Sequence, residues 1–165
     1  MGETTQTGKK GLPSGQGLAC KYAGDTGIAQ HPAVIFADNF ESGALSGPWD
    51  EARNQKTVLN LARVPGGPVG KRSLRVEAPL GKDTGGGVTK WFQPTATLFV
   101  RFYTRFDEKC DSLHHFVTLR ANKSLQGGDH WSGFGGAGNK PRGDDRFSTA
   151  LEPWGDWGRN PPPGK

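Results

Sequence analysis

The sequence feature that most constrains the fold is the run TLFVRFYTRFDEKCDSLHHFVTLR at residues 97–120, which is rich in aromatic and β-branched residues. Side chains on a strand alternate between the two faces of its sheet. A strand over 98–106 therefore has an apolar face made of Leu98, Val100, Phe102, Thr104 and Phe106. Its other face carries Phe99, Arg101, Tyr103 and Arg105.

Residues 113–120 divide in the same way. One face carries Leu113, His115, Val117 and Leu119, and the other carries His114, Phe116, Thr118 and Arg120. The polar DEKCDS between the two runs is short enough for a hairpin loop. If the apolar faces coincide, one surface of the sheet gathers Arg101, Tyr103, Arg105, His114 and Arg120. We therefore predict a central hairpin with a cationic, partly aromatic surface that also bears an imidazole.

The rest of the chain alternates short β-forming runs with turns. Only 33% of the residues are hydrophobic and 26 are Gly, but five Trp and nine Phe argue against disorder. Further strands are predicted at 33–40, 57–64, 72–79, 88–93 and 146–153, with an extended stretch at 131–138. Helical periodicity is nearly absent. This pattern predicts an all-β fold, a two-sheet antiparallel sandwich of the jelly-roll type.

The ends of the chain suggest a simple domain organisation. Residues 1–32 are rich in Gly, Thr and Lys and are predicted to be a flexible lead-in, followed by one β domain over 33–165. The final PPPGK has the composition of a loop that awaits a strand, so we expect a domain truncated at its C-terminus. A frayed tail is the alternative. The first thirty residues contain no apolar core of a secretory signal, which would then precede Met1.

The formal net charge of +5 limits the class of partner. No Lys/Arg run exceeds two residues, so a basic tail for nucleic acid is absent, and no segment is long and apolar enough to span a membrane. Arginines interleaved with aromatic residues suit a shaped groove for an acidic polysaccharide, although solubility alone could explain the charge. We expect a monomer. Cys20 and Cys110 could form one bridge in an exported protein, and the sequence leaves this open.

Three segments together resemble secreted jelly rolls of the concanavalin-A-like class. FADNFESG followed by a Trp is similar to the D-[DN]-F-E entry strand of laminin-G-like and lyase-like domains, and GKRSLRVEAP is similar to their Gly-Lys-x-Ser-Leu-Arg strand. LFVRFYTRFDEKC and LHHFVTLRAN resemble the central strands of jelly-roll polysaccharide lyases. The similarity covers residues 33–153. It implies a concanavalin-A-like jelly roll, secreted or periplasmic, that acts as a polysaccharide lyase.

A lyase of this kind cleaves a uronic acid by β-elimination. It neutralises the sugar carboxylate, removes the C5 proton and helps the leaving oxygen depart, for which Arg and a His or Tyr are suited. We predict a catalytic set of His114, Tyr103 and Arg101, with His114 preferred over His115 because it lies on the polar face. Substrate-binding charges are predicted at Arg105, Arg120 and Lys90. The alternative is that these side chains are simply solvated on a strand face.

The tryptophans offer stacking surfaces for sugar rings. Trp131, Trp154 and Trp157 lie in Gly-rich surroundings and are predicted to form a ligand platform, whereas Trp49 and Trp91 are assigned to core packing. If this platform binds without catalysis, the chain is a carbohydrate-binding or laminin-G-like adhesion module. A structural surface protein without a ligand is a third reading.

Metal and hydrolase chemistry have less support in the sequence. Adjacent His114 and His115 point to opposite faces of a strand, so they cannot bind one ion without a bulge. We predict no catalytic metal and no required cofactor. A structural calcium ion is the candidate at Asp38, Asn39 and Glu41, where oxygen ligands cluster. The Glu-x-Asp-x-x-Glu pattern of jelly-roll hydrolases does not occur.

Overall fold

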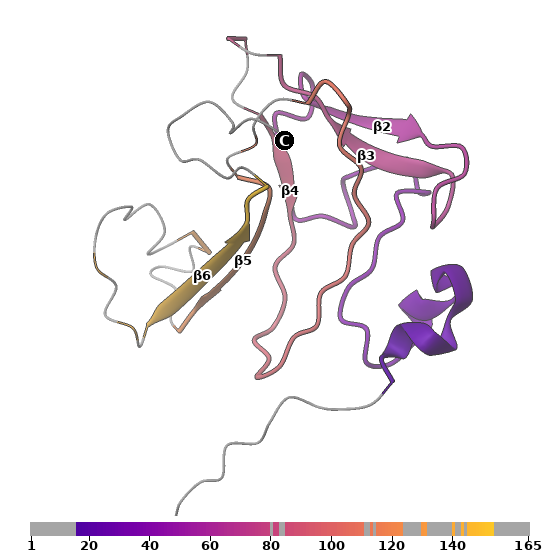
Figure 1. Ribbon diagram of the computed structural model, residues 1–165. Coiled ribbons are helices and arrows are strands. Elements are labelled where there is room, and N and C mark those ends of the chain that lie inside the picture. The colour runs from indigo at the N-terminus through magenta and orange to yellow at the C-terminus, as the bar shows by residue number, and fades with distance from the viewer. Residues whose placement is uncertain are drawn as a thin grey trace, which may run out of the picture. The chain divides into compact units, whose positions relative to one another are not determined.

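The computed structural model describes residues 16–79, 81–82, 85–110, 113, 115–123, 130–131, 140, 143 and 145–153. Within these residues the regular elements are six strands and three short 3₁₀ helices, and the strands pair in small antiparallel ladders (Figure 1). The predicted β-rich, nearly helix-free character is therefore confirmed. None of the helices in this part of the chain has the length and hydrophobicity needed to cross a membrane.

The chain divides into two compact units, Met1–Lys90 and Trp91–Lys165. The first unit begins with three 3₁₀ helices inside the predicted lead-in, namely η1 (Leu18–Lys21), η2 (Ala23–Asp25) and η3 (Ile28–Gln30). Each is closed by i→i+3 hydrogen bonds, such as the one from the Tyr22 N–H to the Ala19 carbonyl at 3.1 Å.

Two antiparallel ladders follow in the first unit. β2 (Leu59–Arg63) pairs with β3 (Arg72–Val76), within the strands predicted at 57–64 and 72–79. β1 (Glu51–Arg53) pairs with β4 (Gly87–Thr89), which overlaps the strand predicted at 88–93. β1 was not expected, because its three residues follow a Gly- and Pro-containing loop and are too few to show alternation.

The hydrophobic core of the first unit lies at the start of β2. Val58 is completely buried, and Leu59 and Leu45 are 5% and 3% exposed. Partly buried residues packed against these three are Phe40, Trp49, Ala52, Leu61, Leu74 and Val88. The core therefore joins both ladders of this unit to the loop that contains Leu45.

The strand predicted at 33–40 is not formed, because local side-chain hydrogen bonds fold its end into a turn. Asp38 Oδ1 accepts a hydrogen bond from the Phe40 N–H at 2.8 Å, and Phe40 has a φ of 60°. Asp38 Oδ2 accepts from Trp49 Nε1 at 2.6 Å. A short Asp side chain that bonds the backbone two residues on competes in this way with a sheet ladder.

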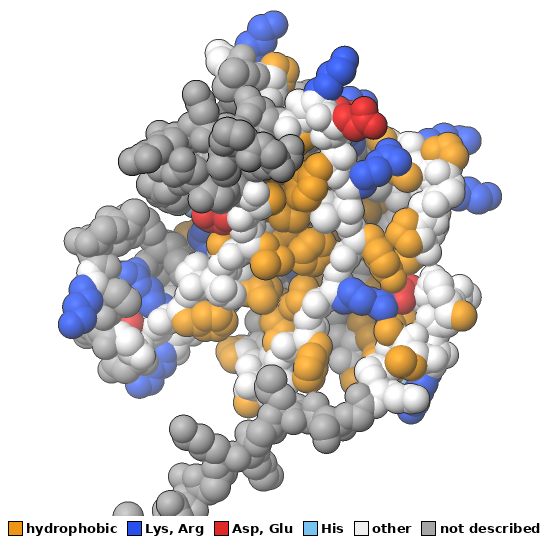
Figure 2. All heavy atoms as spheres, in the orientation of Figure 1, with side chains coloured by type: hydrophobic (Ala, Val, Ile, Leu, Met, Phe, Trp, Pro, Cys, Tyr) orange, Lys and Arg blue, Asp and Glu red, His pale blue; other side chains and the backbone are white. Residues whose placement is uncertain are grey.

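The second unit contains β5 (Val117–Asn122) and β6 (Arg146–Leu151), which form a six-residue antiparallel ladder. β5 overlaps the run predicted at 113–120, and β6 lies within the strand predicted at 146–153. The strand predicted at 98–106 is an extended segment that joins no ladder among the described residues (Figure 1). Its aromatic side chains are exposed, with Phe99 at 70%, and hydrophobic side chains are open to solvent in the surface view (Figure 2).

Substitution of the enclosed core valine tests this assignment. Val58→Ala removes two carbons from a site without solvent access and leaves a cavity, so the free energy of unfolding should fall by about 2 kcal/mol. Val76→Ala is the matched control, because Val76 is 52% exposed and its truncation should cost less than about 0.5 kcal/mol. Urea unfolding followed by circular dichroism measures both. Equal losses would show that Val58 is not the centre of the core.

Candidate functional site

The register of the β5–β6 ladder decides which side chains share a face. Arg120 lies opposite Ser148 and Asn122 lies opposite Arg146, so these four residues stand on one face. The other face carries Val117, Leu119, Ala121, Phe147, Thr149 and Leu151. The ladder is therefore amphipathic, with a polar, cationic face that two arginines dominate.

An aromatic cluster lies against this polar face. The Cζ atom of Arg120 is 5.1 Å from the ring centroid of Trp131. Trp131 meets Trp91 edge to face at 5.2 Å, and Trp91 stacks on the imidazole of His130 at 4.8 Å with an interplanar angle of 20°. These four side chains, called the Arg120 cluster below, combine a guanidinium, two indoles and an imidazole.

The Arg120 cluster is accessible to a ligand. Trp131 is 39% exposed, and Arg120 and His130 are also exposed. A guanidinium over an indole is attracted by about 0.5–1 kcal/mol at an exposed site, which helps to hold Arg120 against the Trp131 ring. The cluster therefore presents an oriented cation beside an apolar ring edge, a combination that suits a ligand with both a carboxylate and C–H faces.

The segment 98–106 shows the predicted alternation. The Arg101 Cζ atom lies 5.6 Å from the Tyr103 ring centroid, so these two side chains share one side of the extended chain. Phe102 and Phe106 both contact Phe116, with centroid distances of 5.9 and 5.3 Å. Arg105, two residues after Tyr103, is also exposed, as are Arg101 and Tyr103.

The predicted central hairpin is wrong, because 98–106 joins no ladder among the described residues. The single surface that would gather the five chemical groups stays a prediction, since His114 lies outside these residues. β5 pairs with β6, and in the described residues the segment 98–106 contacts Phe116, the residue before β5, through phenyl rings rather than backbone hydrogen bonds. Phe116 was expected on the side of Arg120, yet it packs on the apolar side of 98–106. Arg101 and Tyr103 are thus brought together, whereas Arg120 belongs to a different cluster.

The predicted histidine and tryptophan sites are only partly visible. His114, Trp154 and Trp157 lie outside the described residues. His115 Nδ1 is 2.8 Å from Glu152 Oε1, and its side chain is 72% exposed. The alternative base therefore has a carboxylate partner, while the roles assigned to His114, Trp154 and Trp157 remain predictions.

Lys90 belongs to the first unit and is held there by its own neighbours. Its Nζ atom is 3.0 Å from Asp50 Oδ1 and 5.6 Å from the centroid of the Phe36 ring. The Asp50 carboxylate partly offsets the positive potential of the Lys90 ammonium, which weakens its attraction for an anionic substrate. Its proposed contribution to binding remains a prediction.

The oxygens proposed for calcium accept hydrogen bonds from the protein. Glu41 Oε1 accepts from the backbone N–H groups of Lys71 and Arg72 at 2.6 and 2.7 Å, and Asn39 Oδ1 accepts from the Glu41 N–H at 3.1 Å. No group of three or more His, Cys, Asp or Glu side chains suited to a metal is found in the described ranges. The Glu41 carboxylate therefore acts as a clasp between two segments, and calcium at this turn stays a prediction.

Sequence reasoning did not predict several residues of the Arg120 cluster and of the polar face of the β5–β6 ladder. Trp91 was assigned to the core, and Asn122 and Arg146 were not singled out. Alternation along 146–153 could have placed Arg146 on the polar face, but only a known register pairs it with Asn122. The signal for Trp91 was weaker, because its contact with His130 and Trp131 joins residues about 40 positions apart.

Comparison with known proteins adds no family. No protein-family model, no curated protein and no solved structure matches this chain. The function therefore has to be argued from the chemistry of the residues described above. The resemblance to jelly-roll lyases remains a prediction from three short motifs.

The Glu41 clasp predicts a pH dependence of stability. The hydrogen bond from the Lys71 N–H, helped by that from Arg72, lowers the pKa of the Glu41 carboxyl below its ordinary value of 4.5. A carboxyl whose pKa falls on folding stabilises the protein above its ordinary pKa, and this contribution is lost as the pH falls through the lower folded pKa. Glu41→Gln should therefore be less stable than the native chain at pH 7. In acid, where Glu41 is protonated, the two proteins should have similar free energies of unfolding.

Urea unfolding at a series of pH values measures this difference. Glu77→Gln is the control, because the Glu77 carboxylate forms an exposed ion pair with Arg75 at 2.9 Å and its loss should matter little. If Glu41→Gln lowers the free energy of unfolding by the same amount at pH 7 and in acid, the negative charge of Glu41 does not contribute to stability.

Proposed function

We propose that this chain is a concanavalin-A-like jelly-roll protein that holds an acidic polysaccharide on the Arg120 cluster. The observation that supports the proposal best is the Arg120 guanidinium 5.1 Å above the exposed Trp131 ring, on the polar face of the β5–β6 ladder. A uronic acid chain repeats a carboxylate and a pyranose ring, which are the groups that this pair complements. The same protein is proposed to be secreted or periplasmic and monomeric.

Binding at the cluster divides into two kinds of contact. The sugar carboxylate receives charge-assisted hydrogen bonds from Arg120, whose planar fork fits a carboxylate with two parallel bonds. The C–H face of the ring packs on exposed indole surface of Trp131, and Trp91 supports that indole from its edge. Trp154 and Trp157 are proposed as further platforms, and Arg105 and Lys90 as further charges.

The reaction proposed for the bound polysaccharide is β-elimination. Arg101 would neutralise the carboxylate next to the C5 proton, while Tyr103 and His114 would carry protons from C5 and to the leaving oxygen. The supporting geometry is the 5.6 Å contact that holds the Arg101 guanidinium against the Tyr103 ring, with both groups exposed. This pair offers the cation and the phenol that the reaction needs on one side of the chain.

A non-catalytic carbohydrate-binding or laminin-G-like adhesion module is the second candidate. It is favoured by the separation of groups in the second unit, since the stacking surfaces lie in the Arg120 cluster with the His130 imidazole, whereas Tyr103 lies beside Arg101 on the segment 98–106. In this reading Arg101 and Tyr103 serve only as additional contacts for the polymer. A structural calcium ion remains compatible with either candidate.

Binding is tested by truncating the platform. Titration of the protein with glucuronan and alginate, followed by isothermal calorimetry, should give an affinity that falls by about 10- to 100-fold in Trp131→Ala, because each tenfold loss corresponds to about 1.4 kcal/mol. Phe92→Ala is the matched control, because Phe92 is 43% exposed and lies outside the cluster. Equal affinities for Trp131→Ala and the native chain would remove the cluster from the proposal.

Catalysis is tested separately by following the ultraviolet absorbance of the unsaturated product with the same polysaccharides and with glycosaminoglycans. Tyr103→Phe should lower the turnover rate by about 10²- to 10⁴-fold, as expected for loss of a proton-transfer group. Tyr22→Phe is the control, since this tyrosine lies between η1 and η2 in the first unit. Unchanged turnover in Tyr103→Phe would refute its role, and binding without product would favour the adhesion module.

A further inference from the structure

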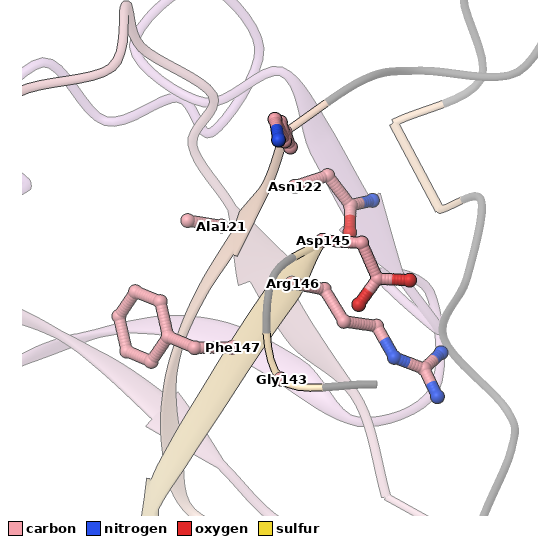
Figure 3. A pocket seen from close by; sticks show the side chains of 7 residues that line it. Ala121, Asn122, Gly143, Asp145, Arg146 and Phe147 are labelled. Atoms are coloured by element: carbon pink, nitrogen blue, oxygen red, sulfur yellow. The ribbon is translucent and has the colours of Figure 1, made fainter. Parts of the chain in front are cut away.

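A shallow surface hollow of about 320 Å³, largely open to solvent, lies at the loop end of the β5–β6 ladder, outside the Arg120 cluster (Figure 3), and is called the cavity below. Its lining is formed by Ala121, Asn122, Lys123, Gly143, Asp145, Arg146 and Phe147. A hollow of this volume that is open to solvent can contact one side of a ligand of the size of one sugar unit. Nothing in the proposed polysaccharide site uses this cavity.

The backbone holds the rim of the cavity in place. The Lys123 N–H donates to the Asp145 carbonyl at 2.7 Å, which adds one more pair to the ladder after Asn122 and Arg146. Gly143 has a φ of 92°, a conformation that favours glycine and lets the chain turn at the rim. The described part of the rim is therefore the end of a paired ladder together with Gly143.

The side chains of Asn122, Asp145 and Arg146 project to the same side of the ladder, whereas Phe147 and Ala121 project to the other (Figure 3). Together the three present an amide, a carboxylate and a guanidinium. Arg146 makes no hydrogen bond or ion pair with any other residue that the structure describes. Its guanidinium therefore remains available to an incoming acceptor.

The charges of the lining indicate the class of ligand. Among the lining residues that the structure describes, Lys123 and Arg146 are cationic and Asp145 is anionic, which favours an anionic ligand. The Asn122 amide can donate and accept, and a carboxylate can accept from hydroxyl groups. A bare anion would use only the cations, whereas a hydroxylated acid would use all three kinds of group.

The position of the cavity relates it to the Arg120 cluster. Arg120 and Arg146 form a diagonal pair on the polar face, with Cα atoms about 7–8 Å apart. We propose that the cavity is a second subsite, which binds one uronate unit of a sugar chain through Arg146 and Asn122. This inference rests on the proposed function for its ligand class, but it concerns different residues and can be tested without the polymer.

The test uses D-glucuronate as a probe with the ¹⁵N-labelled full chain, followed by two-dimensional NMR. Glucuronate should shift the amide signals of Asn122, Lys123 and Arg146 with saturation, whereas D-glucose and inorganic phosphate should shift them at least tenfold less at equal concentration. Equal shifts with phosphate would reduce the cavity to a general anion site and overturn the proposal. Absence of shifts with glucuronate would overturn it as well.

Two variants separate this subsite from the Arg120 cluster. Arg146→Gln should weaken glucuronate binding at least tenfold, while Arg75→Gln, which removes the same charge from β3, should not change it. Trp131→Ala should leave glucuronate binding in the cavity intact even though it weakens binding of the polymer. If Arg146→Gln has no effect while Trp131→Ala weakens both ligands, only the proposed function survives. If glucuronate binds as expected but Trp131→Ala does not change the affinity for the polymer, only the subsite proposal is supported.

Discussion

The register of the β5–β6 ladder is the constraint on which its polar, cationic face depends. Because side chains alternate along a strand, a slip of one residue in one strand would send its polar set to the opposite face. Arg120 and Asn122 would then no longer share a face with Arg146. The apolar residues on the other face, such as Val117 and Leu119, oppose such a slip because it would leave them against polar neighbours.

In the first unit, the Glu41 carboxylate has a comparable organising role. It connects the DNFE segment to the start of β3 through two backbone N–H groups, and so joins two of the three motifs that resemble jelly-roll domains. Gly70 is required beside it, since a Cβ atom there would lie 2.6 Å from Glu41 Oε1 and the φ of Gly70 is 71°. The residues that define the resemblance are therefore explained by local structure, and they do not in themselves argue for a ligand.

Sequence patterns predicted strands and faces better than they predicted partners. β2 and β3 were predicted because both alternate clearly and are separated by a Pro-Gly-Gly turn. The alternation of 98–106 was also predicted, as the shared side of Arg101 and Tyr103 shows. Alternation does not say which strand supplies the backbone partner, however, so the central hairpin was wrong. Trp91 was missed for the same reason, because its neighbours His130 and Trp131 are set by tertiary structure.

In the proposed function, two separate cations on the polar face suit a polymer better than a small ligand. Arg120 is exposed, and Arg146 lines a cavity that is open to water, so each contact with a carboxylate is weakened by solvent and by salt. A chain that carries a carboxylate on each unit can occupy the second subsite at a high effective concentration once the first is bound. The affinity for a polysaccharide can therefore exceed that of either subsite by orders of magnitude, although no single residue is a strong anchor.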